Sequence, residues 1–374
     1  MMRAWSLAAV LLLAVVSLPG APASVSSDLF PYRQHWLGGD AAYSVPLNST
    51  TTVWVFGDTF VGDRRTTGDM IHNSLGIRKC QRSCGVTYWW SGMHGGHPDA
   101  FFRTKESNYF WPLDGFVSNG VLYVFLEQMR ATPEGGAFGF DYQSIKLAVI
   151  SNPTDAPEQW KISYHSVSEG NQVVPGIAAA LADEGGTKYL YVFTLFHRSA
   201  NHPFVGLLRT RVDRLTSTDL RHTWQYMSGP RQWSSWMPST SPQNALELLS
   251  GNITEMSVNY HPELKMWVAV YPTPGGSFRT ASYSQAALVS GPWGQPHRFF
   301  TYPEMRKDDP RHTPNVFCYA AKEHPELEEN AQMAITYACN SFREPEILND
   351  LRLYRPELVI TAMPGSPRPV LTNH

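Results

Sequence analysis

Short runs of alternating hydrophobic and polar residues fill the chain, and one aromatic and aliphatic run occurs five times. The five runs are Val53–Phe56, Leu122–Phe125, Leu190–Phe193, Met266–Ala269 and Met333–Thr336. Equivalent positions in successive runs, counted from Trp54, are 69, 68, 76 and 68 residues apart. Alternation is typical of β-strands, and self-similarity at a nearly constant spacing indicates a repeat architecture. The pattern therefore predicts five similar units of about 70 residues each.

Each unit also contains turn residues and room for more strands. Asn119-Gly120 precedes the second run and Glu184–Thr187 precedes the third, and both sequences are typical of β-hairpin turns. With the recurring run as its second strand, a unit has room for four strands, which is the size of one β-propeller blade. We therefore expect an all-β, five-bladed β-propeller. A pair of β-sandwiches is the competing fold, but it would not explain five nearly equal spacings.

The two ends of the chain are expected to complete the last unit. Leu351–Ile360 alternates like a strand, yet the fifth unit is still one strand short. We expect Val25–Tyr32 to supply that strand by pairing the beginning of the chain with its end, which would close the ring. Residues 24–374 would then form a single domain.

The composition supports this fold class and narrows the range of partners. The chain has 374 residues, with 28 Gly, 28 Pro and 13% aromatic residues, which favours short strands and turns over long helices. Its 30 Lys and Arg residues nearly balance 32 Asp and Glu residues, and only 17% of all residues are charged. Nucleic acid is therefore not expected as a partner.

The first 23 residues have the features of a secretory signal peptide. Met1–Arg3 is a short basic start, Ala4–Leu18 is apolar, and Ala21-Pro22-Ala23 provides the small residues of a cleavage site. The apolar stretch is shorter than the about 20 residues that span a bilayer. We expect a secreted, extracellular and monomeric protein without a membrane span, with an uncleaved membrane anchor as the alternative. Sequons at Asn48 and Asn252 would carry glycans if they are exposed and the host is eukaryotic.

The four cysteines fit an oxidising compartment. Disulfides between Cys80 and Cys84 and between Cys318 and Cys339 are the simplest arrangement, although four cysteines allow three pairings. A zinc site is the weaker interpretation, because the CxxxC spacing has no matching second pair of ligands.

A histidine-containing segment is a second candidate for a metal site. His94, His97 and Asp99 lie close together in the sequence, but Gly95-Gly96 between the histidines favours a loop. The sequence contains no nucleotide-binding fingerprint or phosphate-binding glycine loop. We therefore expect neither a metal nor a cofactor.

The turn at Ser49-Thr50 predicts that two aspartates meet. Residues whose numbers add to about 99 lie opposite each other across this hairpin, so Asp40 should face Asp58 or Thr59. Opposed Cβ atoms are about 5 Å apart, so two carboxyl groups would lie together at the mouth of the central channel. Their repulsion would raise one pKa and keep the other group ionised, which is the arrangement that glycoside hydrolysis requires. Turn aspartates or calcium ligands are the alternative interpretation.

Several motifs together resemble a known family. They are Trp36–Asp40, Val53–Phe60, Asn73-Ser74, Trp111–Gly115, Thr254–Val258 and Tyr354–Pro356. They resemble the secreted five-bladed family catalogued as domain-of-unknown-function family 4185, some members of which are endo-acting D-arabinofuranan hydrolases of glycoside hydrolase family 183. The resemblance spans most of the mature chain, and its distinctive pieces are Gly-Gly-Asp and Phe-Gly-Asp-Thr. It implies that Asp40 and Asp58 are catalytic.

Further acidic and aromatic residues are candidates for the same site. Glu255 could modulate the pKa values of the pair or act as the acid, and Asp114 could bind substrate or simply form a turn. Aromatic side chains cover the apolar faces of sugar rings, while polar groups bind the hydroxyls. The remaining substrate-binding candidates are His35, Trp36, Asn73, Trp89, Trp90 and Trp111. For each tryptophan, packing in the core is the alternative.

Together these features predict a secreted glycoside hydrolase that cleaves furanosidic linkages with a pair of aspartates. By the resemblance, the substrate would be a D-arabinan-type polysaccharide and the cleavage endo-acting. The alternatives are an exo-acting arabinofuranosidase and a propeller that binds carbohydrate or protein without catalysis, since a fold alone does not determine a function. Carboxyl groups that point apart, or that pair with Arg33 or Arg103, would favour the binding protein.

Overall fold

The computed structural model describes residues 24–363, apart from short segments at 27–28, 95–96, 105–107, 134–138, 200, 216–219, 238–239, 241, 276–277 and 329–331. The expected signal peptide, residues 1–23, lies outside this range. The described chain is all-β, as predicted, with the single short α-helix α1 (Glu344–Asn349) among its described elements. No helix in the described ranges is long and apolar enough to cross a membrane.

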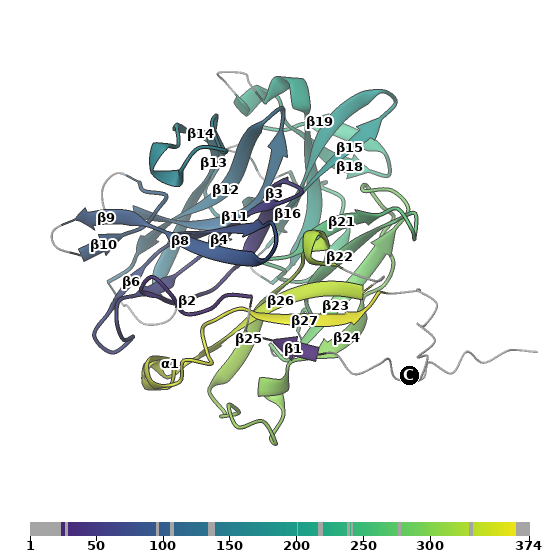
Figure 1. Ribbon diagram of the computed structural model, residues 1–374. Helices are drawn as coiled ribbons and strands as arrows, with labels where there is room; N and C mark the ends of the chain where they lie inside the picture. The colour runs from purple at the N-terminus through teal and green to yellow at the C-terminus, as the bar shows by residue number, and fades with distance from the viewer. Residues whose placement is uncertain are drawn as a thin grey trace, which may run out of the picture.

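Five antiparallel sheets of four or more strands make up most of the described fold (Figure 1). The first contains β3 (Tyr43–Asn48), β4 (Thr51–Phe56), β7 (Ser74–Cys80) and β8 (Cys84–Trp89). The second contains β11 (Asn108–Ser118), β12 (Val121–Ala131), β13 (Phe140–Ile150) and β14 (Ile162–Glu169). The third contains β15 (Val173–Glu184), β16 (Thr187–His197), β17 (Pro203–Arg211), β18 (Gln225–Gly229), β19 (Gln232–Ser235) and β20 (Leu249–Ser250).

The fourth sheet contains β21 (Ser257–His261), β22 (Met266–Pro272), β23 (Thr280–Ala286) and β24 (His297–Thr301). The fifth contains β25 (Val316–Glu323), β26 (Gln332–Ser341), β27 (Glu357–Ala362) and β1 (Ser24–Ser26). Smaller sheets contain β2 (Trp36–Gly39), β5 (Thr59–Val61) and β6 (Asp69–Ile71), and β9 (Ser91–His94) with β10 (His97–Asp99). Short 3-10 turns are η1 (Pro157–Gln159), η2 (Val212–Arg214), η3 (Leu220–His222), η4 (Pro303–Met305) and η5 (Pro325–Leu327).

The recurring hydrophobic runs all lie in the second strand of their sheets. These strands are β4, β12, β16, β22 and β26. They carry long apolar sequences because both of their faces are buried against other strands, as at Val53–Phe56, where every side chain is fully buried. The predicted turn at Asn119-Gly120 is also present, with φ angles of 50° and 75°, which is the left-handed pair that a tight hairpin needs. Strand periodicity was therefore a reliable guide to the sheets.

The beginning and end of the described chain pair as predicted. Strand β1 pairs antiparallel with β27, with Ser24 opposite Ile360, so the first described segment joins the last sheet (Figure 1). Both strands are shorter than expected: β1 covers only 24–26, and β27 begins at Glu357. An Asx turn, in which the Arg352 N–H binds Asp350 Oδ1 at 3.0 Å, and a left-handed Tyr354, with φ of 56°, break the extended backbone before β27.

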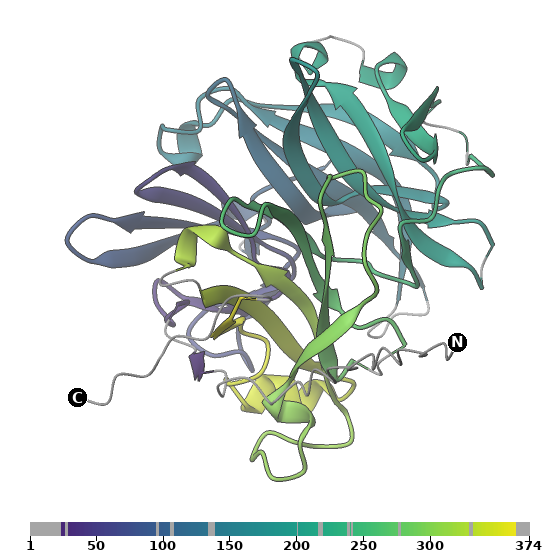
Figure 2. The ribbon, with the colours of Figure 1, turned by 90° about the vertical axis from the view of Figure 1, so that its right-hand side faces the viewer.

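The first strands of successive sheets contact one another, from β3 through β11, β15 and β21 to β25. Following the chain colours in Figure 2, the sheets succeed one another around the molecule. Three of these first strands carry a β-bulge near their middle, between Pro112 and Gly115, between Pro175 and Ala178, and between Tyr319 and Lys322. A bulge changes which residues share a face of the strand, so it decides which side chains reach the same region.

Candidate active site

The structure brings Asp40 and Asp58 together through backbone pairing. Strands β2 and β5 pair with Gly39 opposite Thr59, the Asp40 N–H donates to the Asp58 carbonyl at 3.2 Å, and the Gly57 N–H donates to the Asp40 carbonyl at 3.2 Å. The hairpin pairs add to 99 at Asn48 and Thr51, as predicted, and to 98 beyond a register shift at Pro46. A Cβ on Gly57 would collide with Oδ1 of Asp40, so the absence of a side chain at this glycine makes room for the carboxyl group.

Asp40 is partly buried and lies beside two tyrosines. The hydroxyl of Tyr319 donates to Asp40 Oδ2 at 2.7 Å, and the hydroxyl of Tyr354 donates to the same oxygen at 3.2 Å. Burial, and then the charge of Asp58, raise the pKa of Asp40 to about 8, although the Tyr319 hydrogen bond opposes this rise. The rise favours the protonated form of Asp40.

Asp58 has different neighbours. Its Oδ1 accepts the indole N–H of Trp111 at 2.8 Å and lies 3.0 Å from Nδ1 of His72, and 19% of its side chain remains exposed. The His72 ring stacks on Tyr109 with ring centres 3.7 Å apart, and Trp111 meets the edge of Tyr109 at 5.6 Å. A partly exposed border of aromatic rings thus lies directly beside the Asp58 carboxyl group.

One further acidic residue, Glu255, acts on Asp40, and Glu127 in turn lies within the influence of Glu255. Glu255 forms an ion pair of 2.9 Å with the fully buried Lys322, and its charge adds to the rise in the pKa of Asp40. Glu127, on β12, has its pKa raised to about 8, first by burial and then by the charge of Glu255. The negative charge of Glu255 therefore disfavours ionisation of Asp40.

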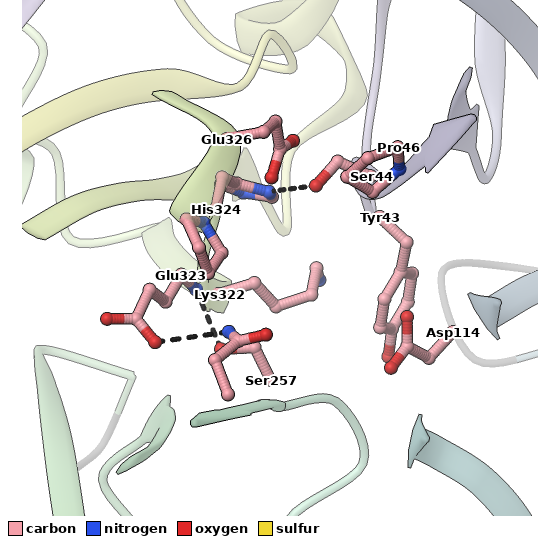
Figure 3. A pocket seen from close by; sticks show the side chains of 11 residues that line it. Tyr43, Ser44, Pro46, Asp114, Ser257, Lys322, Glu323, His324 and Glu326 are labelled. Atoms are coloured by element: carbon pink, nitrogen blue, oxygen red, sulfur yellow. Dashed lines mark hydrogen bonds between the residues drawn. The ribbon is translucent and has the colours of Figure 1, made fainter. Parts of the chain in front are cut away.

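Asp114 lies apart from the aspartate pair. It sits in the β11 bulge, where its Oδ1 accepts the Gly115 N–H at 2.8 Å and its Oδ2 accepts the Ala179 N–H at 2.7 Å. Burial raises its pKa to about 7 in spite of these two donors. It lines a cavity of about 200 Å³ together with Tyr43 and Lys322 (Figure 3), and neither Asp40 nor Asp58 belongs to that lining.

Several predicted substrate-binding residues have packing roles in the structure. Trp36 is fully buried and stacks on Tyr88 at 4.3 Å, so it lies in the core and presents no face to a sugar. Asn73 is also fully buried, and its amide binds the backbone of Phe102 and Phe110. A side-chain amide in this position satisfies backbone groups where two segments meet.

The other candidates lie away from the pair. His35 is exposed and lies 2.9 Å from Asp63. Trp89 lines a separate cavity of about 300 Å³ between the first sheet and residues 153–157, and Trp90 packs against the cluster around Trp36. Of the aromatic candidates, Trp111 alone contacts one of the two aspartates in the described hydrogen-bond network.

Both predicted disulfides are present, Cys80 with Cys84 and Cys318 with Cys339. Cys318 and Cys339 are therefore not available as metal ligands, although their sulfur atoms lie near Glu304. His94 and His97 lie on the paired strands β9 and β10, and His97 binds Asp69 at 2.8 Å. The segment is thus a short hairpin.

Sequence reasoning missed the residues that surround the two carboxyl groups. They are His72, Tyr109, Tyr319, Lys322 and Tyr354. Two of them were adjacent to a recognised motif: His72 precedes Asn73-Ser74, and Tyr354 begins Tyr354-Arg355-Pro356. The others come from strands far away in the sequence, where no local pattern distinguishes them.

Solved structures with a similar fold are known. A proposed hydrolase from Bacteroides ovatus ATCC 8483 is 16% identical, with a TM-score of 0.68 over 89% of this chain and 88% of that one. An alpha-L-arabinofuranosidase from Lactobacillus brevis is 10% identical, with a TM-score of 0.49 over 94% and 100%. An exo-1,5-alpha-L-arabinanase from a bovine ruminal metagenomic library is 12% identical, with a TM-score of 0.43 over 92% and 99%. Comparison with curated proteins finds no match.

The sequence comparison also corrects the family expected from the motifs. The resemblance to domain-of-unknown-function family 4185 is wrong, because a different family matches almost the whole described chain. The Gly-Gly-Asp and Phe-Gly-Asp-Thr pieces on which the resemblance rested were too short to identify the family. The chain belongs to the family described as domain of unknown function DUF5005, whose sequence model matches residues 26–360.

Proposed function

We propose that the protein is a glycoside hydrolase in which Asp40 and Asp58 form the catalytic carboxyl pair. The observation that carries this proposal is the adjacency of two carboxyl groups in unlike environments. The pKa of Asp40 is raised to about 8 by burial and by Asp58, whereas Asp58 lies beside the N–H donor of Trp111 and beside His72. Neighbouring carboxyl groups with separated pKa values are the usual acid and base of glycosidic cleavage.

In this proposal Asp40 is the proton donor. It gives its proton to the leaving glycosidic oxygen as the bond from that oxygen to the anomeric carbon breaks. Asp58 acts on the same carbon, either by attacking it directly or by taking a proton from the attacking water, and one water is consumed in each cycle. Glu255 supports the protonated state of Asp40 through its charge. This chemistry requires no cofactor.

The rings of His72, Tyr109 and Trp111 support a carbohydrate substrate. They form a partly exposed aromatic border next to Asp58, and such surfaces bind the apolar faces of sugar rings. The expectation of D-arabinan came from the corrected resemblance, so the linkage has to come from experiment, with furanosidic glycans as the first candidates. The similar Bacteroides ovatus structure is described as a proposed hydrolase, the broad class of this reaction, but the carboxyl pair carries the proposal.

We further propose that the five sheets are the blades of a five-bladed propeller. The contacts between successive first strands support a ring, as does the 2.7 Å hydrogen bond between Ser44 of β3 and His324 just after β25. Residues 24–374 would form one domain, and the protein would be a monomer. Residues 1–23 would direct its secretion. The two disulfides fit an extracellular location.

The test is hydrolysis of a panel of polysaccharides by the secreted protein and by the variants Asp40→Asn and Asp58→Asn. The panel includes D- and L-arabinans, furanose-containing galactans and xylans, and product sizes distinguish endo from exo cleavage. We expect the wild type to release oligosaccharides and each variant to lose at least 100-fold in rate. Asp213→Asn, at an exposed site on Arg211, is the matched control and should stay active. Activity that survives both changes, or a wild type that binds glycans without cleaving any, would contradict the proposal.

A further inference from the structure

A second cluster of buried acidic and imidazole groups lies away from the aspartate pair. It consists of His261 at the end of β21, Glu323 at the end of β25, and Glu328 just after η5. His261 is 3% exposed, the side chain of Glu323 is fully buried, and Glu328 is partly buried. One ligand atom from each of the three residues lies within 4.8 Å of the other two.

The three atoms that face one another lack hydrogen-bond partners. Nε2 of His261, Oε1 of Glu323 and Oε1 of Glu328 are all buried, and none accepts or donates a hydrogen bond within the described part of the chain. Nε2 and Oε1 of Glu323 are 3.2 Å apart but not aligned for a hydrogen bond. A buried polar atom without a partner costs about 1–3 kcal/mol. Apart from the 3.2 Å ion pair between Nε2 and Glu323, no described group satisfies these three atoms, so a common partner would stabilise them.

The remaining polar side-chain atoms of His261 and Glu323 already have partners. Nδ1 of His261 lies 3.1 Å from Oε1 of Glu263, and Oε2 of Glu323 accepts the amide of Asn259 at 3.1 Å. A carboxylate on Nδ1 favours the proton at that nitrogen, and a bound metal would displace any proton from Nε2, the atom that faces Glu323. Histidine ligands of metals are typically oriented by a carboxylate in this way.

We propose that His261, Glu323 and Glu328 bind a divalent transition-metal ion such as zinc. Zinc binds imidazole nitrogen and carboxylate oxygen at about 2.0–2.2 Å, which places neighbouring ligand atoms about 3.4 Å apart in a tetrahedron. The 3.2 Å between Nε2 and Oε1 of Glu323 is close to that spacing. An imidazole ligand favours zinc and its neighbours over calcium or magnesium, which prefer oxygen.

The ion would also neutralise two buried carboxyl groups. Glu323 is fully buried and Glu328 is partly buried. A divalent cation between them would offset the repulsion of their charges. The groups that face the cluster from neighbouring elements are Glu263 and Asn259.

The position of the cluster gives the ion a structural role. His261 belongs to the fourth sheet, whereas Glu323 belongs to the fifth and Glu328 precedes its second strand, so the ion would link two sheets. In Figure 3 the side chains of Glu323 and Lys322 extend in opposite directions, although Glu323 also lines the cavity. The proposed ion is therefore not part of the proposed hydrolysis, and binding to the folded state alone would stabilise it.

The test uses the intact secreted protein after dialysis against EDTA. We expect it to take up about one zinc per chain by elemental analysis. Its thermal midpoint should rise by about 4 °C when free zinc is 100-fold above the dissociation constant. Calcium should produce no comparable rise. Glu328→Gln and His261→Gln should each weaken zinc binding at least 10-fold, and hydrolytic activity should be unaffected by Glu328→Gln.

His202→Gln is the matched control, because His202 forms an exposed pair with Glu247 at 3.0 Å. It should leave zinc uptake and the zinc-dependent midpoint unchanged. If His261→Gln does not fold, Glu328→Gln decides, since Glu328 is the least buried ligand. A wild type without zinc uptake, a Glu328→Gln variant that binds zinc like the wild type, or an equal response to calcium would overturn the proposal.

Discussion

Replacing Asp40 by asparagine should make the protein more stable at alkaline pH. Asparagine has nearly the same shape as a protonated aspartate and keeps an oxygen that can accept the Tyr319 hydroxyl, which donates to Asp40 Oδ2 at 2.7 Å. It cannot ionise, so it avoids the burial and the repulsion by Asp58 that raise the pKa of Asp40 to about 8. Asp40, the proposed catalytic acid, is thus expected to lower the free energy of unfolding at alkaline pH.

The magnitude follows from the difference between folded and unfolded pKa values. An aspartate in an unfolded chain has a pKa of about 3.9, so below pH 4 the folded and unfolded states are both protonated at Asp40. As the pH rises from about 4 to about 8, the folded state keeps a proton that the unfolded state releases, so the stability from Asp40 is progressively lost by at most about 1.4 kcal/mol per pH unit. Because Asp40 retains some contact with solvent, we expect a total on the order of 3 kcal/mol.

The assay is chemical denaturation of the wild type and of Asp40→Asn at pH values from 5 to 9 and at constant ionic strength. Glu127 and Asp114 titrate in the same range, but both proteins contain them, so the difference in unfolding free energy isolates Asp40. The unfolding free energy of Asp40→Asn should increase relative to that of the wild type as the pH rises. Asp213→Asn is the control, because its bond to Arg211 holds the pKa of Asp213 below the usual range. A difference for Asp40→Asn that stays constant from pH 5 to pH 9 would refute the reasoning.

Two further changes test the position and the protonation of Asp40. Tyr319→Phe removes a hydroxyl whose hydrogen bond lowers the pKa of Asp40, so the alkaline limit of kcat/KM should move above its wild-type position near pH 8; a move to lower pH in the pH–rate profile would contradict this. Gly57→Ala places a methyl group against Oδ1 of Asp40. This change should lower kcat/KM by about 100-fold with a small loss of thermal stability, and an enzyme with unchanged kinetics would show that the carboxyl position is not critical.

The sequence predicted those features that depend on local patterns. The recurring runs identified the second strand of every large sheet, because a strand buried on both faces needs a continuous apolar sequence. Counting across the Ser49-Thr50 turn placed Asp40 beside Asp58, because the register of a short hairpin is fixed by its turn. The nearest pairings of cysteines were also correct.

Features that depend on contacts between distant strands could not be predicted in this way. Trp36 and Asn73 lie beside the aspartates in the sequence, but their side chains are buried in the core, and the sequence does not distinguish the two faces of so short a segment. Tyr319 reaches Asp40 from 279 positions away in the chain. Such distant partners can be identified only when the three-dimensional structure is known.

The β25 bulge shows why alternation alone fails at the centre of this molecule. In a regular strand Tyr319 and Lys322 would point to opposite faces, since side chains alternate with a period of two. The pairing shifts between them, and Ala320 adopts a left-handed φ of 59°, so Tyr319 can bind Asp40 while Lys322 binds Glu255. The next residue, Glu323, then points away toward His261. One extra residue in this strand therefore directs Tyr319 to the proposed catalytic Asp40, Lys322 to the supporting Glu255 and Glu323 to the proposed metal site. A deletion within Ala320-Ala321 should disturb both sites together.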